Sequence, residues 1–238
     1  MILILRLLLV FSLSMSFGIG VTQAAQEESP PCDTVSEAIY FVGLGEAYFA
    51  SKAYNDAILA FSCGLALDDT LVPAYVTRGF ARSIQGDEPG ALEDFNSAIA
   101  LDETSIDAYV SRGTLYMRQG NFALAIGDLT VALALEPDNV SALQNRAVVH
   151  AAEFNYDLAM DDLMLALMIA PDDPALHAAV GAVYLALAAQ SYGQFRALAG
   201  DNVAIPGGAP SSLYLAIERS ALTGNYGDWV ALLRPAGE

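Results

Sequence analysis

Basic residues are scarce in this sequence. Its 238 residues include ten Lys or Arg side chains against 28 Asp or Glu, a formal net charge of −18, and the only lysine is Lys52. A protein this acidic repels nucleic acid and anionic lipid, which argues against both as partners. The charge favours basic or neutral partners, although it also serves simply to keep an apolar, alanine-rich chain in solution.

Motifs of catalysis and metal binding are missing as well. The sequence contains no G-x-S-x-G element, no phosphate-binding loop and no dinucleotide fingerprint. Its two histidines, His150 and His177, have no cysteine or second histidine at the helical spacing of zinc ligands, and we expect both in the core. The acidic pairs Asp68-Asp69 and Asp172-Asp173 lack the alternating acids and glycine of a calcium loop. The sequence therefore predicts no enzyme, no cofactor and no metal site.

Long apolar runs are confined to the N-terminus. Residues 1–24 combine Arg6 near the start, a leucine-rich centre and a small residue, Ala24, before a cleavage point, which is the pattern of a secretory signal peptide. The alternative is a retained membrane anchor. Residues 25–36 are predicted to be a linker, and the longest later apolar run, Ala178–Ala189, is too short to span a bilayer. We therefore expect an exported protein that is periplasmic, envelope-associated or secreted.

Cysteine is rare, with only Cys32 and Cys63. An even number of cysteines in an exported protein favours a disulfide. Such a bond would stabilise the fold by about 3–4 kcal/mol, because it restricts the unfolded chain. The alternative is a pair of free thiols, with Cys63 acting as a small buried apolar residue.

What the sequence does contain is a repeat of 34 residues. Residues 74–95 read AYVTRGFARSIQGDEPGALEDF, and residues 108–129 read AYVSRGTLYMRQGNFALAIGDL. Four successive units align without any insertion, and we number the places within each unit from its first residue. The units begin at Ala38, Val72, Ile106 and Val140. A period of this length indicates an architecture in which each unit is one supersecondary element.

Small and large residues recur at fixed places of the unit. Place 8 holds Gly45, Gly79, Gly113 and Ala147. Place 20 holds Ala57, Ala91, Ala125 and Ala159. Place 24 holds Phe61, Phe95, Leu129 and Leu163. Small residues at places 8 and 20 allow two antiparallel helices to approach closely, and the large residue at place 24 fills the space beside them.

Each unit is predicted to form two helices. In the third unit, the first helix extends from Asp107 to Gln119, and Gly120 suits the left-handed conformation that ends a helix. Asn121 is a good cap for the second helix, which Pro137 stops. One helix pair cannot bury its apolar face alone, but stacked pairs can, so the sequence predicts an all-α solenoid.

These places resemble the tetratricopeptide repeat. That family has a 34-residue helix-turn-helix unit with a large residue at place 4, Gly or Ala at 8, Tyr at 11, Ala at 20, Phe at 24, Ala at 27 and Pro at 32. The resemblance implies a right-handed solenoid of antiparallel helix pairs, with four clear units in residues 37–171. Departures are local: Asp69 and Glu103 replace the proline, and Arg82 and His150 replace the tyrosine.

After residue 171 the pattern weakens. The stretch SYGQFRALA at 191–199 recurs as NYGDWVALL at 225–233, again 34 residues apart, and each follows an apolar helical segment. We expect residues 172–238 to form two divergent units and a C-terminal capping helix around Trp229. Terminal units of a solenoid are atypical because one of their faces must meet water.

Two charged places vary together. Place 7 holds Leu44, Arg78, Arg112 and Arg146. Place 23 holds Ala60, Asp94, Asp128 and Asp162. Since both charges are present or both absent, and since the two helices of a unit lie antiparallel, the pattern predicts a structural ion pair inside units two, three and four. The alternative is a row of ligand-binding arginines.

The first helix of each unit has a further face, which we call the groove face, formed by places 2, 5, 9, 12 and 13. In the family, this face lines a concave groove that binds extended or helical peptides. The candidate partner-binding residues are Val76, Phe80, Ser83, Val110, Thr114, Met117, Arg118, Gln144 and Val148. They suit a protein or peptide partner with an apolar or basic segment. The alternative is that parts of this face pack on neighbouring units or on the N-terminal segment.

The resemblance implies a non-catalytic protein–protein interaction or scaffold module of the cell envelope or extracellular space. The alternative function is an auxiliary or regulatory subunit of an envelope enzyme or of a secretion or assembly complex. Contact with a membrane is expected only through the N-terminal segment, if that segment is not cleaved.

Overall fold

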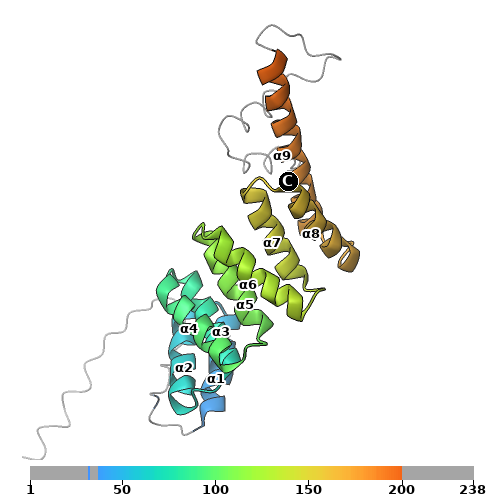
Figure 1. Ribbon diagram of the computed structural model, residues 1–238. Helices are drawn as coiled ribbons and strands as arrows, with labels where there is room; N and C mark the ends of the chain where they lie inside the picture. Colours follow the sequence, from blue (N-terminus) through green and yellow to red (C-terminus); the bar gives the residue numbers. More distant parts are fainter. Residues whose placement is uncertain (1–31, 33–36, 200–238) are drawn as a thin grey trace, which may run out of the picture. The chain divides into compact units, whose positions relative to one another are not determined.

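The computed structural model describes Cys32 and residues 37–199, and this part of the chain contains nine α-helices and no strand. The helices are α1 (Ala38–Ala50), α2 (Tyr54–Leu67), α3 (Val72–Ile84), α4 (Glu88–Leu101), α5 (Ile106–Arg118), α6 (Phe122–Leu135), α7 (Val140–Ala152), α8 (Tyr156–Ile169) and α9 (Pro174–Ala199) (Figure 1). The predicted signal peptide, nearly all of the linker and the predicted sixth unit with Trp229 lie outside the described residues.

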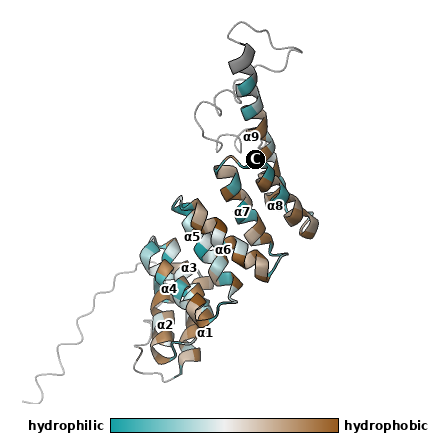
Figure 2. Cartoon of the chain, viewed as in Figure 1, coloured by the Kyte–Doolittle hydropathy of each residue, from teal (hydrophilic) through white to brown (hydrophobic). Residues whose placement is uncertain are grey.

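Consecutive helices form pairs, and each pair is one 34-residue unit. The helices α1 and α2, α3 and α4, α5 and α6, and α7 and α8 pack against each other, and each unit also contacts the next. Every helix carries both hydrophobic and hydrophilic residues (Figure 2). The predicted all-α solenoid of helix pairs is confirmed.

The turn inside each unit depends on one residue in the left-handed region of backbone space. That residue stands at place 15 in every unit: Lys52, Gly86, Gly120 and Phe154, with φ between 63° and 84°. Glycine adopts this conformation freely, whereas a bulky side chain does so rarely and at a cost of about 1 kcal/mol. Lys52 and Phe154 are therefore unusual residues at this place of the unit.

The core follows the places that the repeat predicts. The alanines at place 20 are fully buried in all four units, as are Phe61, Phe95, Leu129 and Leu163 at place 24. The glycines at place 8 lie against these large side chains. A Cβ atom added to Gly79 would lie 2.7 Å from the ring of Phe95, and one added to Gly113 would lie 3.0 Å from Leu129. Close helix approach therefore explains the glycine at place 8.

The fifth unit differs from the expected helix pair. Residues 191–199, which follow the apolar helical segment of the expected fifth unit, continue α9 as a single helix of 26 residues. The physical reason is the sequence around place 15, which here is Ala188 within the run LALAAQ, because alanine and leucine favour the helix interior and no glycine interrupts them. Residues 174–191 of α9 are also long and apolar enough to cross a membrane by length and composition, in contrast to the expectation that the apolar run Ala178–Ala189 is too short. In the structure, α9 packs on α7 and α8.

A disulfide joins Cys32 to Cys63 on α2, with their Cα atoms 5.2 Å apart. Cys63 is buried, and Cys32 lies just before the first unit. The bond therefore ties the segment that precedes α1 to the second helix of unit one.

Candidate functional site

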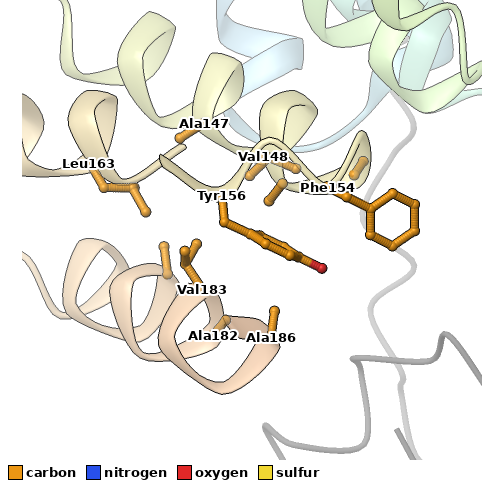
Figure 3. A pocket seen from close by; sticks show the side chains of 11 residues that line it. Ala147, Val148, Phe154, Tyr156, Leu163, Ala182, Val183 and Ala186 are labelled. Atoms are coloured by element: carbon orange, nitrogen blue, oxygen red, sulfur yellow. The ribbon is translucent and has the colours of Figure 1, made fainter. Parts of the chain in front are cut away.

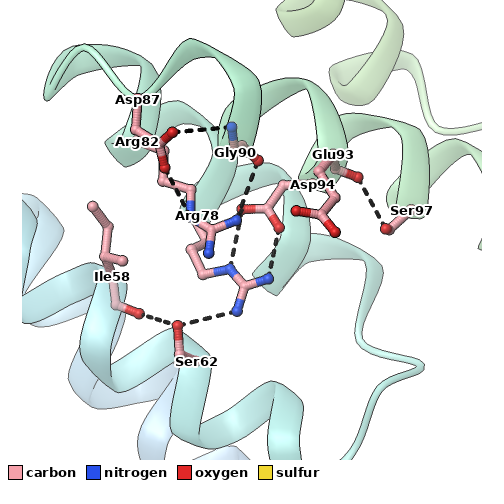
Figure 4. Close-up of polar contacts among 9 residues, drawn as sticks. All are labelled: Ile58, Ser62, Arg78, Arg82, Asp87, Gly90, Glu93, Asp94 and Ser97. Carbon is pink, nitrogen blue, oxygen red and sulfur yellow. Dashed lines mark hydrogen bonds and ion pairs between the residues drawn. The ribbon is translucent and has the colours of Figure 1, made fainter.

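The arginines and aspartates that vary together form bidentate ion pairs. Arg78 donates from Nε and Nη2 to the two carboxylate oxygens of Asp94, at 3.0 and 2.6 Å (Figure 4). The pairs Arg112–Asp128 and Arg146–Asp162 have the same geometry, with distances of 2.7–2.8 Å. Two parallel hydrogen bonds between a guanidinium and a carboxylate are among the strongest polar contacts in proteins.

Each of these arginines also donates a third hydrogen bond to the preceding unit. The acceptor stands at place 25 in every case: Ser62 for Arg78, Asn96 for Arg112 and Thr130 for Arg146. Figure 4 shows the first of these networks, in which the Arg78 guanidinium lies between Asp94 of its own unit and Ser62 of unit one. The arginine therefore joins two units, a role that sequence reasoning missed because the third partner changes residue type.

Electrostatics keep these groups charged. Hydrogen bonding to Asp128 raises the pKa of Arg112 above its ordinary value, and Asp162 does the same for the pKa of Arg146, against the opposing effect of burial. Asp94 is fully buried and receives a second ion pair from Arg82, with Nη1 3.0 Å from its carboxylate. Because three donors of each place-7 arginine are engaged within the fold, this row is structural and does not present an open anion site.

Part of the groove face is used in contacts between units. Arg118 donates to the buried Ser83 hydroxyl at 2.8 Å, and Asn145 donates to Thr114 at 2.9 Å. Met117 and Val110 are half-buried and pack on the core. The half-buried Val76 and Gln144 complete the central set. The middle of the groove face is therefore mostly packed between the units.

Three candidate residues of the groove face are exposed, and besides Arg118 they are the apolar Phe80 and Val148. Phe80 and Val148 each expose 45% of their surface. Phe80 packs on Phe49 of unit one, with ring centroids 5.9 Å apart. Phe49 and Phe80 stand at places 12 and 9 of successive units, so the two rings meet across the junction between units one and two. Phe49 is half-buried and Phe80 is exposed, so the pair presents one aromatic ring to an apolar partner segment.

Val148 lines an apolar pocket of about 460 Å³ between α7, the start of α8, and α9. Figure 3 shows Val148 and Phe154 on one side, Ala182, Val183 and Ala186 of α9 on the other, and the Tyr156 ring between them. The remaining lining residues are Ala147, Ala151, Ala152, Leu163 and Ala179. None of these described lining residues is charged, so the pocket is suited to an apolar group.

Sequence reasoning missed this pocket and most of its residues. One signal was available: Phe154 stands at the turn place where glycine is expected, with φ at 63° and 63% of its surface exposed. A bulky residue held in this conformation on a surface is a candidate for function rather than for stability. Its ring packs edge-on against Tyr156, with centroids 6.3 Å apart.

The histidines occupy different environments. His150 is half-buried, whereas His177 is exposed and its Nε2 lies 2.7 Å from the carbonyl oxygen of Pro171, so the expectation that His177 belongs to the core is wrong. Within the described residues, no group of three His, Cys, Asp or Glu side chains is placed to hold a metal ion.

The period of 34 residues, the helix pairs and the close contacts between places 8 and 24 together identify the fold. The chain is a tetratricopeptide repeat protein. It is similar to a crystal structure of MamA, with 25% identity and a TM-score of 0.54, over 57% of this chain and 80% of that chain. No protein-family model and no curated protein sequence matches it.

Two other solved structures share the fold of this tetratricopeptide repeat protein. A second MamA structure matches with a TM-score of 0.57 and 18% identity, over 84% of this chain and 97% of that one. The APC/C hetero-tetramer Cut9–Hcn1 matches with a TM-score of 0.59 and 20% identity, over 80% of this chain and 37% of that one. At these identities the likeness establishes the fold alone.

Proposed function

We propose that this tetratricopeptide repeat protein is a non-catalytic interaction or scaffold module that holds a partner protein against its groove face. The observation that carries the proposal is the exposure of Phe80, Val148 and Phe154 on or beside that face. Exposed aromatic and aliphatic side chains that gather next to an apolar pocket are typical of a contact surface.

The charge of the chain supports a partner of particular character. With a net charge of −18, the protein attracts basic segments and repels acidic ones over several ångströms. The signal-peptide pattern of residues 1–24 supports an exported location, so we place the partner in the cell envelope or outside the cell.

The test is a partner pull-down from envelope extracts with the full chain and three variants. Phe80→Asp and Met117→Asp introduce a charge on the groove face, and we expect each to lower capture of the partner at least tenfold. Leu101→Asp is the matched control, because Leu101 exposes 46% of its surface on the second helix of unit two. Unchanged circular dichroism must accompany the loss. Capture that is unaffected by both groove-face variants would contradict the proposal.

The identity of the captured protein separates two roles. A stable complex with a catalytic or secretion subunit would make this chain an auxiliary or regulatory subunit of that assembly. Capture of a non-catalytic partner would instead support a general scaffold.

A further inference from the structure

The pocket between unit four and α9 lies at the places of the repeat that hold two packed aromatic rings at the first junction. At the junction of units one and two, Phe49 at place 12 packs on Phe80 at place 9 of the next unit. Three units later, the same two places hold Ala151 and Ala182, and both alanines line the pocket. The replacement of two phenylalanines by two alanines therefore leaves a space of about 460 Å³ on the groove face.

The two junctions between these ends are closed by other side chains. Arg118 reaches across the junction of units two and three to Ser83, and Asn145 reaches across the junction of units three and four to Thr114. Met117, at the place of Ala151, packs on the core. At the described junction with α9, the small side chains of Ala151 and Ala182 leave this space unfilled. We call the resulting pocket on the groove face the socket.

The surroundings of the socket are acidic. Residues 146–195 contain six acidic side chains and one basic residue, Arg146, which pairs with the buried Asp162. Glu153 and Asp157 are both exposed, and they stand next in the sequence to Phe154 and Tyr156, which line the pocket. An apolar socket with an acidic edge suits an apolar side chain whose neighbours are basic.

We propose that this pocket receives one large aromatic or branched apolar side chain from a basic segment of a partner protein. The proposal rests on the proposed function and names the partner segment that the groove face selects. The chain's own C-terminal residues 200–238 carry four acidic and two basic side chains, so their charge does not complement the acidic edge. A partner segment rich in Lys and Arg does.

The first test is a matched pair of fluorescein-labelled peptides titrated into the full chain by fluorescence anisotropy. The probe is Gly-Lys-Lys-Trp-Lys-Lys-Gly, and the control is Gly-Lys-Lys-Ala-Lys-Lys-Gly. Both have the same charge, so their affinity ratio isolates the contribution of the side chain from general attraction to an acidic protein. We expect the tryptophan peptide to bind at least tenfold more tightly, and added salt to weaken both peptides.

Variants then locate the binding site. Ala151→Phe with Ala182→Phe copies the ring pair of the first junction into the pocket, and we expect the tenfold ratio to fall below twofold. Val148→Asp is a second variant that should fold regardless, because Val148 is exposed, and it should also reduce the ratio. Val131→Asp, at an exposed position on α6, is the matched control and should leave the ratio unchanged.

Several results would overturn the proposal. Equal binding of the tryptophan and alanine peptides would mean that no socket for a large side chain exists. If Gly-Glu-Glu-Trp-Glu-Glu-Gly bound as tightly as the lysine-rich tryptophan peptide, the pocket would not select a basic segment. A tenfold gain in peptide affinity on Trp229→Ala would show that the chain's own C-terminal segment fills the pocket. If light scattering shows a dimer of the unmodified chain and a monomer of the Ala151→Phe, Ala182→Phe variant, the pocket is filled by a second copy of this chain.

A negative result in the peptide test can be separated from a negative result in the pull-down. The pull-down depends on Phe80 and Met117, which do not line the pocket. If those variants lose the partner while the peptide ratio is near one, the groove face still binds a protein and only the socket proposal falls.

Discussion

The first and the last described junctions of the solenoid use the same places with different residues. At the first junction, Arg78 donates to Ser62, and Phe80 packs on Phe49. At the junction with α9, the places of these four residues are taken by Val180, Met164, Ala182 and Ala151. The hydrogen bond between units and the ring pair are therefore both replaced at α9.

The turns between units differ in the same way. The turn after α2 is closed by Asp68, which accepts hydrogen bonds from the backbone and side chain of Thr70, and Asp102 with Thr104 repeats this after α4. Ala170 stands at that place before α9, although Asp173 accepts a hydrogen bond from the amide of Ala175 at the start of the helix.

This difference shows how a repeat protein can make one position special without changing its fold. The helices keep their places, because place 20 and place 24 remain buried through unit four. At the junction with α9, apolar residues stand at the places of the inter-unit hydrogen bond and of the ring pair, while α9 still packs on α7 and α8. The result is a helix held mainly by apolar contacts and a pocket beside it.

The largest expected effect comes from breaking the ion-pair cluster inside unit two. Asp94→Ala should lower the free energy of unfolding by about 3–5 kcal/mol, because it leaves Arg78 without its carboxylate in a half-buried site and leaves Arg82 with only its longer contact to Asp87. Urea unfolding followed by circular dichroism measures this change. A loss below about 1 kcal/mol would mean that these ion pairs contribute little to the stability of the fold.

Unit three provides the matched comparison for that pair. Arg112→Ala leaves Asp128 unpaired, whereas Arg112→Leu with Asp128→Ala reproduces the Leu44 and Ala60 found at the same places of unit one. We expect the double variant to be the more stable of the two. If the single change is milder, the pairing account is wrong.

Replacement of the glycine at place 8 by alanine should change the unfolding free energy in opposite directions in unit two and in α9. Gly79→Ala forces the ring of Phe95 to move and should cost about 1–3 kcal/mol of unfolding free energy. Gly181→Ala on α9 should instead stabilise by up to about 1 kcal/mol, because no described atom lies within 4 Å of the added methyl group and alanine is the better helix former. Thermal unfolding of both variants checks the pair, and equal effects would contradict the contrast between the two regions.

Filling the pocket should make the last junction resemble the first. Ala151→Phe with Ala182→Phe adds two rings at the places of Phe49 and Phe80, and we expect a gain of about 1 kcal/mol in unfolding free energy. The measurement is the urea midpoint at an unchanged slope. A loss of stability would show that the pocket is narrower than its volume suggests.

The smallest expected effect concerns the turns. Hydrogen bonds from Thr104 lower the pKa of Asp102, so the stability that they contribute is present at neutral pH and is lost as the pH falls through the lowered pKa. Thr104→Ala should raise the pKa of Asp102 towards its ordinary value, as measured by NMR titration. An unchanged pKa would mean that these hydrogen bonds do not persist in solution.

The sequence predicts the helix pairs well because the residues that pack them recur as the same letters. Glycine or alanine at place 8 and a large residue at place 24 stand in all four units, and the arginines and aspartates vary together. The bridge to the preceding unit was not predictable in this way, since Ser62, Asn96 and Thr130 share only a polar hydrogen-bond acceptor.

The pocket was hidden for a different reason. Its origin is missing bulk at Ala151 and Ala182, and alanine is common throughout the chain. Only the structure shows that places 12 and 9 of successive units face each other across a junction, as Phe49 and Phe80 do.

Site-specific photo-crosslinking tests the central claim most directly. A crosslinking amino acid is placed at Phe80, at Val148 or at Leu101, which expose 45%, 45% and 46% of their surface. The products are then mapped by mass spectrometry. The account predicts that Phe80 and Val148 crosslink to the same partner protein through an apolar segment flanked by basic residues, and that Leu101 does not. Crosslinks at Leu101 with none at Phe80 or Val148 would contradict it.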